Sequence, residues 1–187
     1  DVDTLTPVKS DSRLYIWQGD ITTLKCDAIV NACNSQMLGC FSPMHACIDN
    51  FIHTYAGVEL RLKMHEIMAK QGHEEETGRA KITSGYNLPA KYILHTVGPI
   101  IQWKVTKEDE ALLASCYTEC LKLAADTGVE SITFCCLSTG VFRFPQQRAA
   151  EIATNTVKQY LNEDSRIKKV IFNVFKDKDL KIYSGLL

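Results

Sequence analysis

The sequence predicts an α/β fold in which helices cover both faces of a sheet. Short apolar runs alternate along the chain with longer segments that have helical spacing of apolar residues, which is typical of this class. Residues 131–137 are almost continuously apolar and residues 27–31 contain a short apolar run, as buried strands do. The chain has 187 residues and 45% hydrophobic content, which suits one domain with a sizeable core.

Strands are expected where apolar residues alternate or run without interruption. The expected strands are residues 13–18, 27–31, 80–84, 92–97, 131–137 and 168–175. Helices are expected where apolar residues recur every three or four positions. The expected helices are residues 48–56, 58–70, 108–125 and 146–160. No repeat or linker interrupts this pattern, so we expect an N-terminal extension over residues 1–12 and one domain over residues 13–187.

Composition narrows the choice of partners and compartment. The formal net charge is −1 with acidic and basic residues interspersed, so we do not expect nucleic acid as a partner. No apolar stretch approaches about 18 residues, so we expect no membrane span. The eight cysteines include the adjacent pair Cys135 and Cys136 in an apolar run, which favours a reducing, intracellular location in the cytoplasm. The chain begins with Asp1, so we expect further residues upstream, and we expect a monomer.

A cluster of metal-binding side chains is the strongest local signal. Cys40, His45 and Cys47 fall within eight residues, immediately before Asp49. Catalytic zinc sites typically have three protein ligands and an open fourth position. The spacing is not that of a zinc finger, and two ligands at i and i+2 diverge on a helix, so we expect a loop shaped by Pro43. The alternative is that the cysteines are small buried hydrophobes.

Three loops that follow expected strands have the chemistry of a dinucleotide site, at the sheet edge where ligands collect. Asp20 can accept a hydrogen bond from the exocyclic amine of a base, or it can cap a helix. The amides of residues 31–39 can hold sugar hydroxyls, or this segment can be a turn. Residues 138–145 include Gly140, which lets backbone amides approach a pyrophosphate.

Five ordered motifs, which together span nearly the whole chain from Arg13 onward, resemble those of macrodomains. The motifs are QGDIT (residues 18–22), DAIVNACNSQMLG (27–39), IDNFIHTYAG (48–57), YNLPAKYILHTVGP (86–99) and STGVF (138–142). The resemblance implies a three-layer α/β/α fold with a central mixed, mostly parallel sheet. It also implies binding of ADP-ribose, which many macrodomains hydrolyse from modified proteins.

The resemblance implies a role for each loop. Asp20 would hold the adenine amine, Ile21 would offer its backbone amide, and Asn34 would contact the distal ribose. The residues that would wrap the diphosphate are Ser138, Thr139, Gly140, Val141 and Phe142. Phe142 would also stack on the distal ribose or pack in the core, and Phe175 would lie against adenine or pack at the end of the sheet.

The segment CFSPMHAC after Gly39 departs from the glycine-rich stretch of ordinary macrodomain hydrolases. It resembles the zinc-containing macrodomains of microbes, which are often encoded beside a sirtuin-type ADP-ribosyltransferase. This resemblance implies that Cys40, His45 and Cys47 bind Zn2+ near the distal ribose. His53 matches a histidine common in macrodomains without zinc and is expected to pack. For His65, His73 and His95 we identify no converging partners, and we expect each to be exposed to solvent or hydrogen-bonded within the fold.

We therefore expect a zinc-dependent hydrolase that removes mono-ADP-ribose from Asp and Glu side chains of a modified protein substrate. Asn34 and Asp49 are the expected catalytic residues, although Asp49 can also be a helix-capping residue. Zinc would either activate the water or position the ribose. A nucleophilic Cys47 is not expected, because its thiolate would bind the metal. The alternatives are an ADP-ribose-binding reader module without turnover and an O-acyl-ADP-ribose deacylase.

Overall fold

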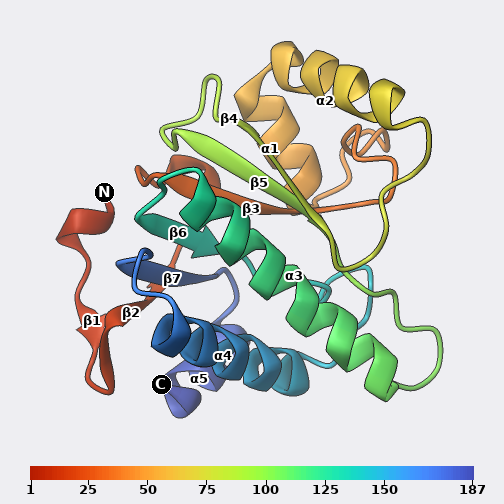
Figure 1. Cartoon of the computed structure of the whole chain (residues 1–187). Coiled ribbons are helices and arrows are strands. Elements are labelled where there is room, and N and C mark those ends of the chain that lie inside the picture. The colour runs from red at the N-terminus through yellow and green to blue at the C-terminus, as the bar shows by residue number, and fades with distance from the viewer.

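A seven-stranded sheet lies between two layers of helices in the computed structural model, which describes residues 1–187 (Figure 1). The strands are β1 (Pro7–Val8), β2 (Asp11–Gln18), β3 (Ala28–Cys33), β4 (Ala80–Ser84), β5 (Tyr92–Val97), β6 (Ser131–Phe134) and β7 (Lys169–Val174). Their order in the sheet is β1-β2-β7-β6-β3-β5-β4. The five central strands are parallel, and the edge strands β1 and β4 are antiparallel to their neighbours.

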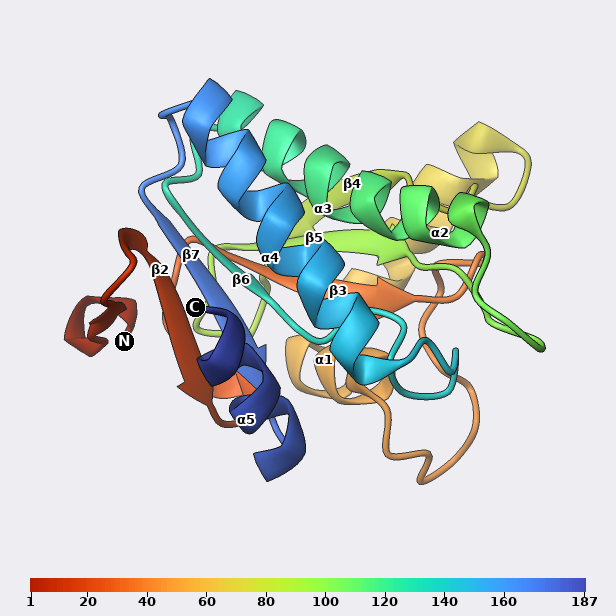
Figure 2. The same ribbon diagram turned by 90° about the horizontal axis from the view of Figure 1, so that it is seen from below.

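The helices form the outer layers of the fold. The α-helices are α1 (Ile48–Ala56), α2 (Val58–Gln71), α3 (Lys107–Asp126), α4 (Gln146–Glu163) and α5 (Asp177–Leu186), and two short 3-10 helices are η1 (Val2–Thr4) and η2 (Ile21–Thr23). Figures 1 and 2 show α1 and α2 on one face of the sheet and α3, α4 and α5 on the other. The predicted three-layer fold with a mixed, mostly parallel sheet is confirmed. None of the helices combines the length and apolar character needed to span a membrane.

The strand β6 is shorter than its apolar run predicts. It pairs with β7 only as far as Phe134, opposite Phe172, so the expectation of a strand over residues 131–137 is wrong. Cys135 and Leu137 are nevertheless buried. A buried loop has the same apolar signature as a buried strand, and here the loop fills the core while it leaves the sheet.

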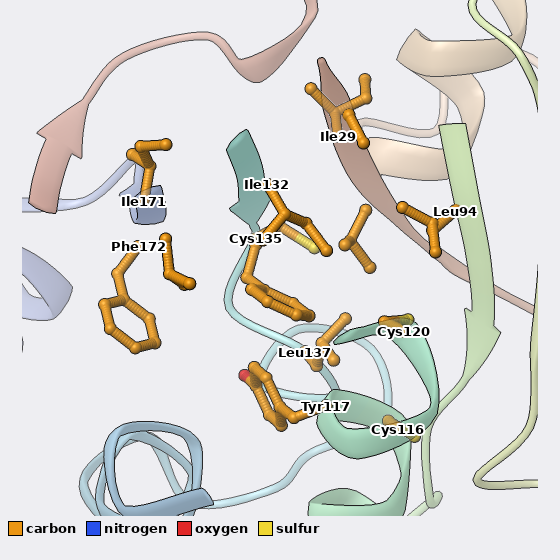
Figure 3. Close-up of a cluster of buried hydrophobic side chains, with 14 of the residues drawn as sticks. Ile29, Leu94, Cys116, Tyr117, Cys120, Ile132, Cys135, Leu137, Ile171 and Phe172 are labelled. Carbon is orange, nitrogen blue, oxygen red and sulfur yellow. The ribbon is translucent and has the colours of Figure 1, made fainter. Parts of the chain in front are cut away.

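Cysteines contribute to the core between the sheet and α3. Figure 3 shows Cys116, Cys120 and Cys135 among Ile132, Tyr117 and other buried apolar side chains. All eight cysteines of the chain are free thiols. The interpretation as small hydrophobes therefore fits these three cysteines, whereas Cys40 and Cys47 are only half-buried and lie outside the core.

Residues 1–12 pack against the domain. Val2 is buried, and its backbone N–H donates to the carbonyl oxygen of Lys25 at 3.0 Å. The Ser10 hydroxyl donates to the carbonyl oxygen of Leu187 at 2.6 Å. The strand β1 pairs with β2, so this segment adds an edge strand to the sheet.

Two long loops leave the sheet at the carboxyl ends of neighbouring strands, because β3 and β6 are parallel neighbours. One joins β3 to α1 through residues 34–47, and the other joins β6 to α4 through residues 135–145. Both loops extend to the same side of the sheet in Figure 1, where they are orange and teal. Ligands of α/β folds bind at this edge, beyond the carboxyl ends of the strands.

Candidate functional site

Cys40, His45 and Cys47 come together as predicted. One ligand atom from each residue lies within 4.8 Å of the other two, and Sγ of Cys40 is 3.3 Å from Nδ1 of His45. Donor atoms around a tetrahedral zinc ion lie roughly 3.5–4 Å apart, given Zn–S and Zn–N distances of about 2.3 and 2.0 Å. Two sulfurs and one imidazole nitrogen are the donor types that zinc prefers. The three residues therefore fit a zinc ion with one coordination position left over.

The ligands lie on an irregular loop, as expected from their spacing. Met44 has a left-handed backbone with φ 58°, next to Pro43. The backbone N–H of His45 donates to the carbonyl oxygen of Ser42 at 3.2 Å. The loop ends at Cys47, which is the N-cap of α1, and its Sγ accepts from the backbone N–H of Asn50 at 3.4 Å. This turn brings His45 back toward Cys40.

Asp49 lies two residues beyond the last of these ligands, in the first turn of α1. Its side chain is buried, and Oδ1 accepts a hydrogen bond of 2.8 Å from Nδ2 of Asn31. Burial raises the pKa of Asp49 to about 6, against the opposing effect of the Asn31 bond. Oδ2 makes no hydrogen bond within the chain. The helix-capping interpretation of Asp49 is wrong, because Cys47 is the N-cap.

His53 packs one turn further along α1, as expected. Its ring is buried, and Nε2 lies 3.5 Å from Oδ1 of Asp49, which is longer than a good hydrogen bond. Burial lowers the pKa of His53 to about 4. Gly39 lies against this ring with φ +87°, and a Cβ atom at position 39 would be only 2.8 Å from Cγ of His53. A glycine is therefore needed where the loop passes over His53.

Asn34 holds the loop after β3 in a turn. Its Oδ1 accepts from the backbone N–H groups of Gln36 and Met37 at 3.1 and 3.2 Å, and its Nδ2 donates to the carbonyl oxygen of Gly39 at 3.3 Å. This is the turn that we weighed as an alternative. The side chain is half-exposed, and its predicted contact with a ribose stays a prediction.

The loop after β6 offers backbone donors. The N–H groups of Gly140, Val141 and Phe142 donate no hydrogen bond within the chain. A Cβ atom at Gly140 would have no neighbour within 4 Å, so this part of the loop is open. Successive free amides in an irregular loop make an anion-binding concavity.

Hydrogen bonds at both ends hold this loop in shape. Ser138 and Arg143 both have left-handed backbones with φ 62°, and the N–H of Phe144 donates to the carbonyl oxygen of Ser138 at 2.9 Å. The Thr139 hydroxyl donates to the carbonyl oxygen of Cys136 at 2.9 Å. Phe142 is half-buried, whereas Phe144 is the aromatic residue that packs in the core. The free amides are therefore held in place without ligand.

Asp20 and Ile21 lie where β2 ends. Oδ1 of Asp20 caps η2 by accepting from the N–H and hydroxyl of Thr22 at 2.9 and 2.7 Å, so the capping interpretation of Asp20 is confirmed. Oδ2 of Asp20 makes no hydrogen bond in the chain. Ile21 is the first residue of η2, so its amide has no partner within that turn. Phe175 is 75% exposed, which rules out a core role.

His95 is a buried histidine whose two ring nitrogens have polar partners within the fold, which is one of the two alternatives expected for it. His95 is fully buried in β5, in register with Asn31 of β3, and the two side chains are in contact. Asn31 lies within the strand rather than in the loop that we assigned to sugar binding. A polar residue inside an apolar strand is a sequence signal for such a contact, since buried polar groups need partners.

Comparison with known proteins gives consistent results. A family model described as Macro domain matches residues 30–153. A protein of Treponema medium named "Protein-ADP-ribose hydrolase" is 61% identical over 185 residues, which are 98% of this chain and 71% of that protein. A protein of Fusarium oxysporum f. sp. cubense named "Probable bifunctional ADP-ribose hydrolase/ADP-ribosyltransferase" is 45% identical over 186 residues, covering 94% of this chain and 31% of that protein.

The fold also matches solved structures. The structure of a Trypanosoma brucei macrodomain in complex with ADP-ribose superposes with a TM-score of 0.84 at 34% identity. The match covers 99% of this chain and 75% of that chain.

Proposed function

Because this chain belongs to the Macro domain family, we propose that it is a zinc-dependent hydrolase that removes mono-ADP-ribose from the Asp and Glu side chains of modified proteins. The names of its relatives support the hydrolysis of ADP-ribose from proteins. The zinc requirement is inferred from the metal-binding side chains of this chain, and the acidic linkage is inferred from its resemblance to the zinc-containing macrodomains.

One observation carries the proposal. A buried carboxylate with one unbonded oxygen, that of Asp49, follows two residues after the last of three zinc-type ligands. Burying a carboxylate costs free energy, so such a group is typical of a reactive site. A module that only binds ADP-ribose needs neither the buried acid nor a metal site that has an open position.

The proposed binding residues match the parts of ADP-ribose. The free amides of residues 140–142 would donate to the diphosphate, which presents anionic oxygens. Oδ2 of Asp20 would accept from the adenine amine while Oδ1 continues to cap η2. Asn34 would contact the distal ribose, with Ser138, Thr139 and the ring of Phe142 on the other side of the ligand.

The reaction adds water across the ester between the distal ribose and an acidic side chain, and it yields free ADP-ribose and the carboxylic acid. Oδ2 of Asp49 would orient the attacking water or a ribose hydroxyl and accept its proton. Asn34 would hold the sugar in the reactive pose. A zinc ion bound by Cys40, His45 and Cys47 would supply a Lewis acid, which polarises an oxygen atom or acidifies a water molecule.

An ADP-ribosyltransferase must supply the substrate, since the hydrolase removes the group that such an enzyme attaches. The relative whose name combines hydrolase and ADP-ribosyltransferase supports this pairing. We propose a transferase of the sirtuin type as the partner enzyme.

A panel of linkages tests the proposal. The protein would be incubated with mono-ADP-ribosylated proteins modified on Asp or Glu, on serine or on arginine, and with an O-acyl-ADP-ribose. We expect release of ADP-ribose from the acid-linked protein only, and none with the Asp49→Ala variant. Binding of ADP-ribose without release from any substrate would mean a reader module. Faster turnover of the small acyl ester than of the protein would mean a deacylase.

A further inference from the structure

A line of buried polar side chains crosses the sheet from β4 to Asp49. Thr83 in β4, His95 in β5 and Asn31 in β3 are all buried. Oγ1 of Thr83 lies 2.9 Å from Nε2 of His95, and Nδ1 of His95 lies 3.4 Å from Nδ2 of Asn31. The same Nδ2 lies 2.8 Å from Oδ1 of Asp49. The four side chains therefore form one continuous chain of polar contacts.

The hydrogen atoms along this chain can be assigned. The Thr83 hydroxyl donates to the carbonyl oxygen of Ser84 at 3.1 Å, so it is free to accept from Nε2–H of His95. Nδ1 of His95 then has a lone pair, which accepts from one N–H of Asn31. This assignment requires a neutral ring, and complete burial lowers the pKa of His95 to about 3. The second N–H of Asn31 is donated to Asp49.

The assignment also determines which way the Asn31 amide points. With its oxygen and nitrogen exchanged, Asn31 would present an acceptor to two other acceptors, the Asp49 carboxylate and the His95 lone pair. In the observed orientation, Oδ1 of Asn31 is buried without a hydrogen-bond partner. A buried oxygen without a partner is costly, so the two bonds made by Nδ2 hold the amide in this orientation.

We propose that Thr83, His95 and Asn31 are positioning residues that hold Oδ1 of Asp49 and leave Oδ2 as the oxygen that acts on the substrate. This inference rests on the proposed function of Asp49. Asp49 lies in the first turn of a helix that follows a long irregular loop, and Asn31 is the only hydrogen-bond partner of its side chain on the sheet. His95 orients Asn31, and Thr83 orients His95. None of the three residues need touch the substrate.

The matched variants Thr83→Val and Thr83→Ser test this chain at its far end. Valine keeps the shape but removes the hydroxyl that accepts from His95, whereas serine keeps the hydroxyl. We expect kcat to fall about fivefold in Thr83→Val and about 100-fold in Asn31→Ala, since small displacements of a catalytic group have effects of this size. KM and zinc content should stay within twofold of wild type in both. Thr83→Ser should keep kcat within twofold.

Crystal structures of the same variants complete the test. In Asn31→Ala and Thr83→Val we expect the Asp49 carboxyl to rotate from its wild-type position. An unchanged kcat in Thr83→Val with an unmoved Asp49 would overturn the inference, as would an equal loss in Thr83→Val and Thr83→Ser. If Asn31→Ala does not fold, the comparison of Thr83→Val with Thr83→Ser decides whether the inference holds. If the wild-type protein hydrolyses none of the linkages, the proposed function fails, and the position of Asp49 in the variant crystals then decides the inference by itself.

Discussion

The loops after β3 and β6 leave the same edge of the sheet but offer different chemistry. The loop of residues 34–47 presents side chains, the thiols of Cys40 and Cys47 and the imidazole of His45. The loop of residues 138–145 presents mainly backbone N–H groups that have no partner in the chain. The first loop therefore depends on residue identity, and the second depends on backbone shape. We infer that the first carries the reaction and the second carries ligand binding.

The largest effect is expected from removing a metal ligand. Cys47→Ala or His45→Ala should abolish zinc binding and lower turnover by at least about 100-fold, since even residues beyond the ligands affect metal sites by up to about that factor. ADP-ribose affinity should change less than threefold, because the binding loop is untouched. Metal analysis, single-turnover release and calorimetry would measure the three quantities. Full turnover in a metal-free variant would contradict the division between the loops.

Replacing Asp20 should weaken ADP-ribose binding and leave the rate of hydrolysis unchanged. Asp20→Ala should weaken ADP-ribose binding by about 1–3 kcal/mol, the size of a lost charge-assisted hydrogen bond, and leave turnover at saturation unchanged. Because Asp20 also caps η2, Asp20→Asn is the control: it keeps an oxygen for the cap but loses the carboxylate. Weak binding in both variants supports the adenine contact. Weak binding in Asp20→Ala alone would assign the effect to the cap.

Replacing one glycine by alanine in each loop compares how tightly the two loops are packed. Gly39→Ala should lower the free energy of unfolding by about 1–3 kcal/mol, because Cβ would meet the His53 ring in a left-handed backbone. Gly140→Ala should change the equilibrium constant of unfolding by no more than about twofold, since its Cβ meets no protein atom within 4 Å. Urea denaturation and calorimetry measure both. Equal stability losses would mean that the loops do not differ in packing.

The smallest effect is a pH dependence of stability that arises from His95 in β5. The folded-state pKa of His95 is lowered by burial to about 3, from an unfolded value of about 6.5. The unfolded chain therefore binds more protons between these values, and stability falls as pH falls through this window. His95→Gln should reduce the slope of unfolding free energy between pH 4 and 6 by up to about 1.4 kcal/mol per pH unit. An unchanged slope would mean that His95 titrates normally.

Much of the fold could be predicted from local sequence pattern. The alternation of apolar runs predicted the six longer strands and the helices α1 to α4. It missed α5, which contains Gly185 in its last turn, and β1, which has two residues. The end of β6 could not be predicted, because Cys135 and Leu137 are buried in a loop as completely as they would be in a strand. Periodicity records burial rather than pairing.

The candidate site also has one part that local sequence predicts and one part that it does not. Cys40, His45 and Cys47 are close in sequence, so their spacing was enough to predict that they meet. The contacts of Asn31 with Asp49 and His95 span 18 and 64 residues and form only when α1 packs on the sheet and β3 pairs with β5. No local pattern contains that information. The buried asparagine and histidine in apolar strands were the only trace of it.

Chelation of one wild-type preparation tests the central claim most directly. Zinc content, ADP-ribose affinity, circular dichroism and release from an acid-linked substrate would be measured before chelation, after chelation and after zinc is returned. We predict that chelation removes zinc and abolishes release, that affinity and fold persist, and that zinc restores release. Undiminished release from the zinc-free protein would contradict a metal-dependent reaction. Unfolding together with zinc loss would show a structural metal and contradict the division of labour between the two loops.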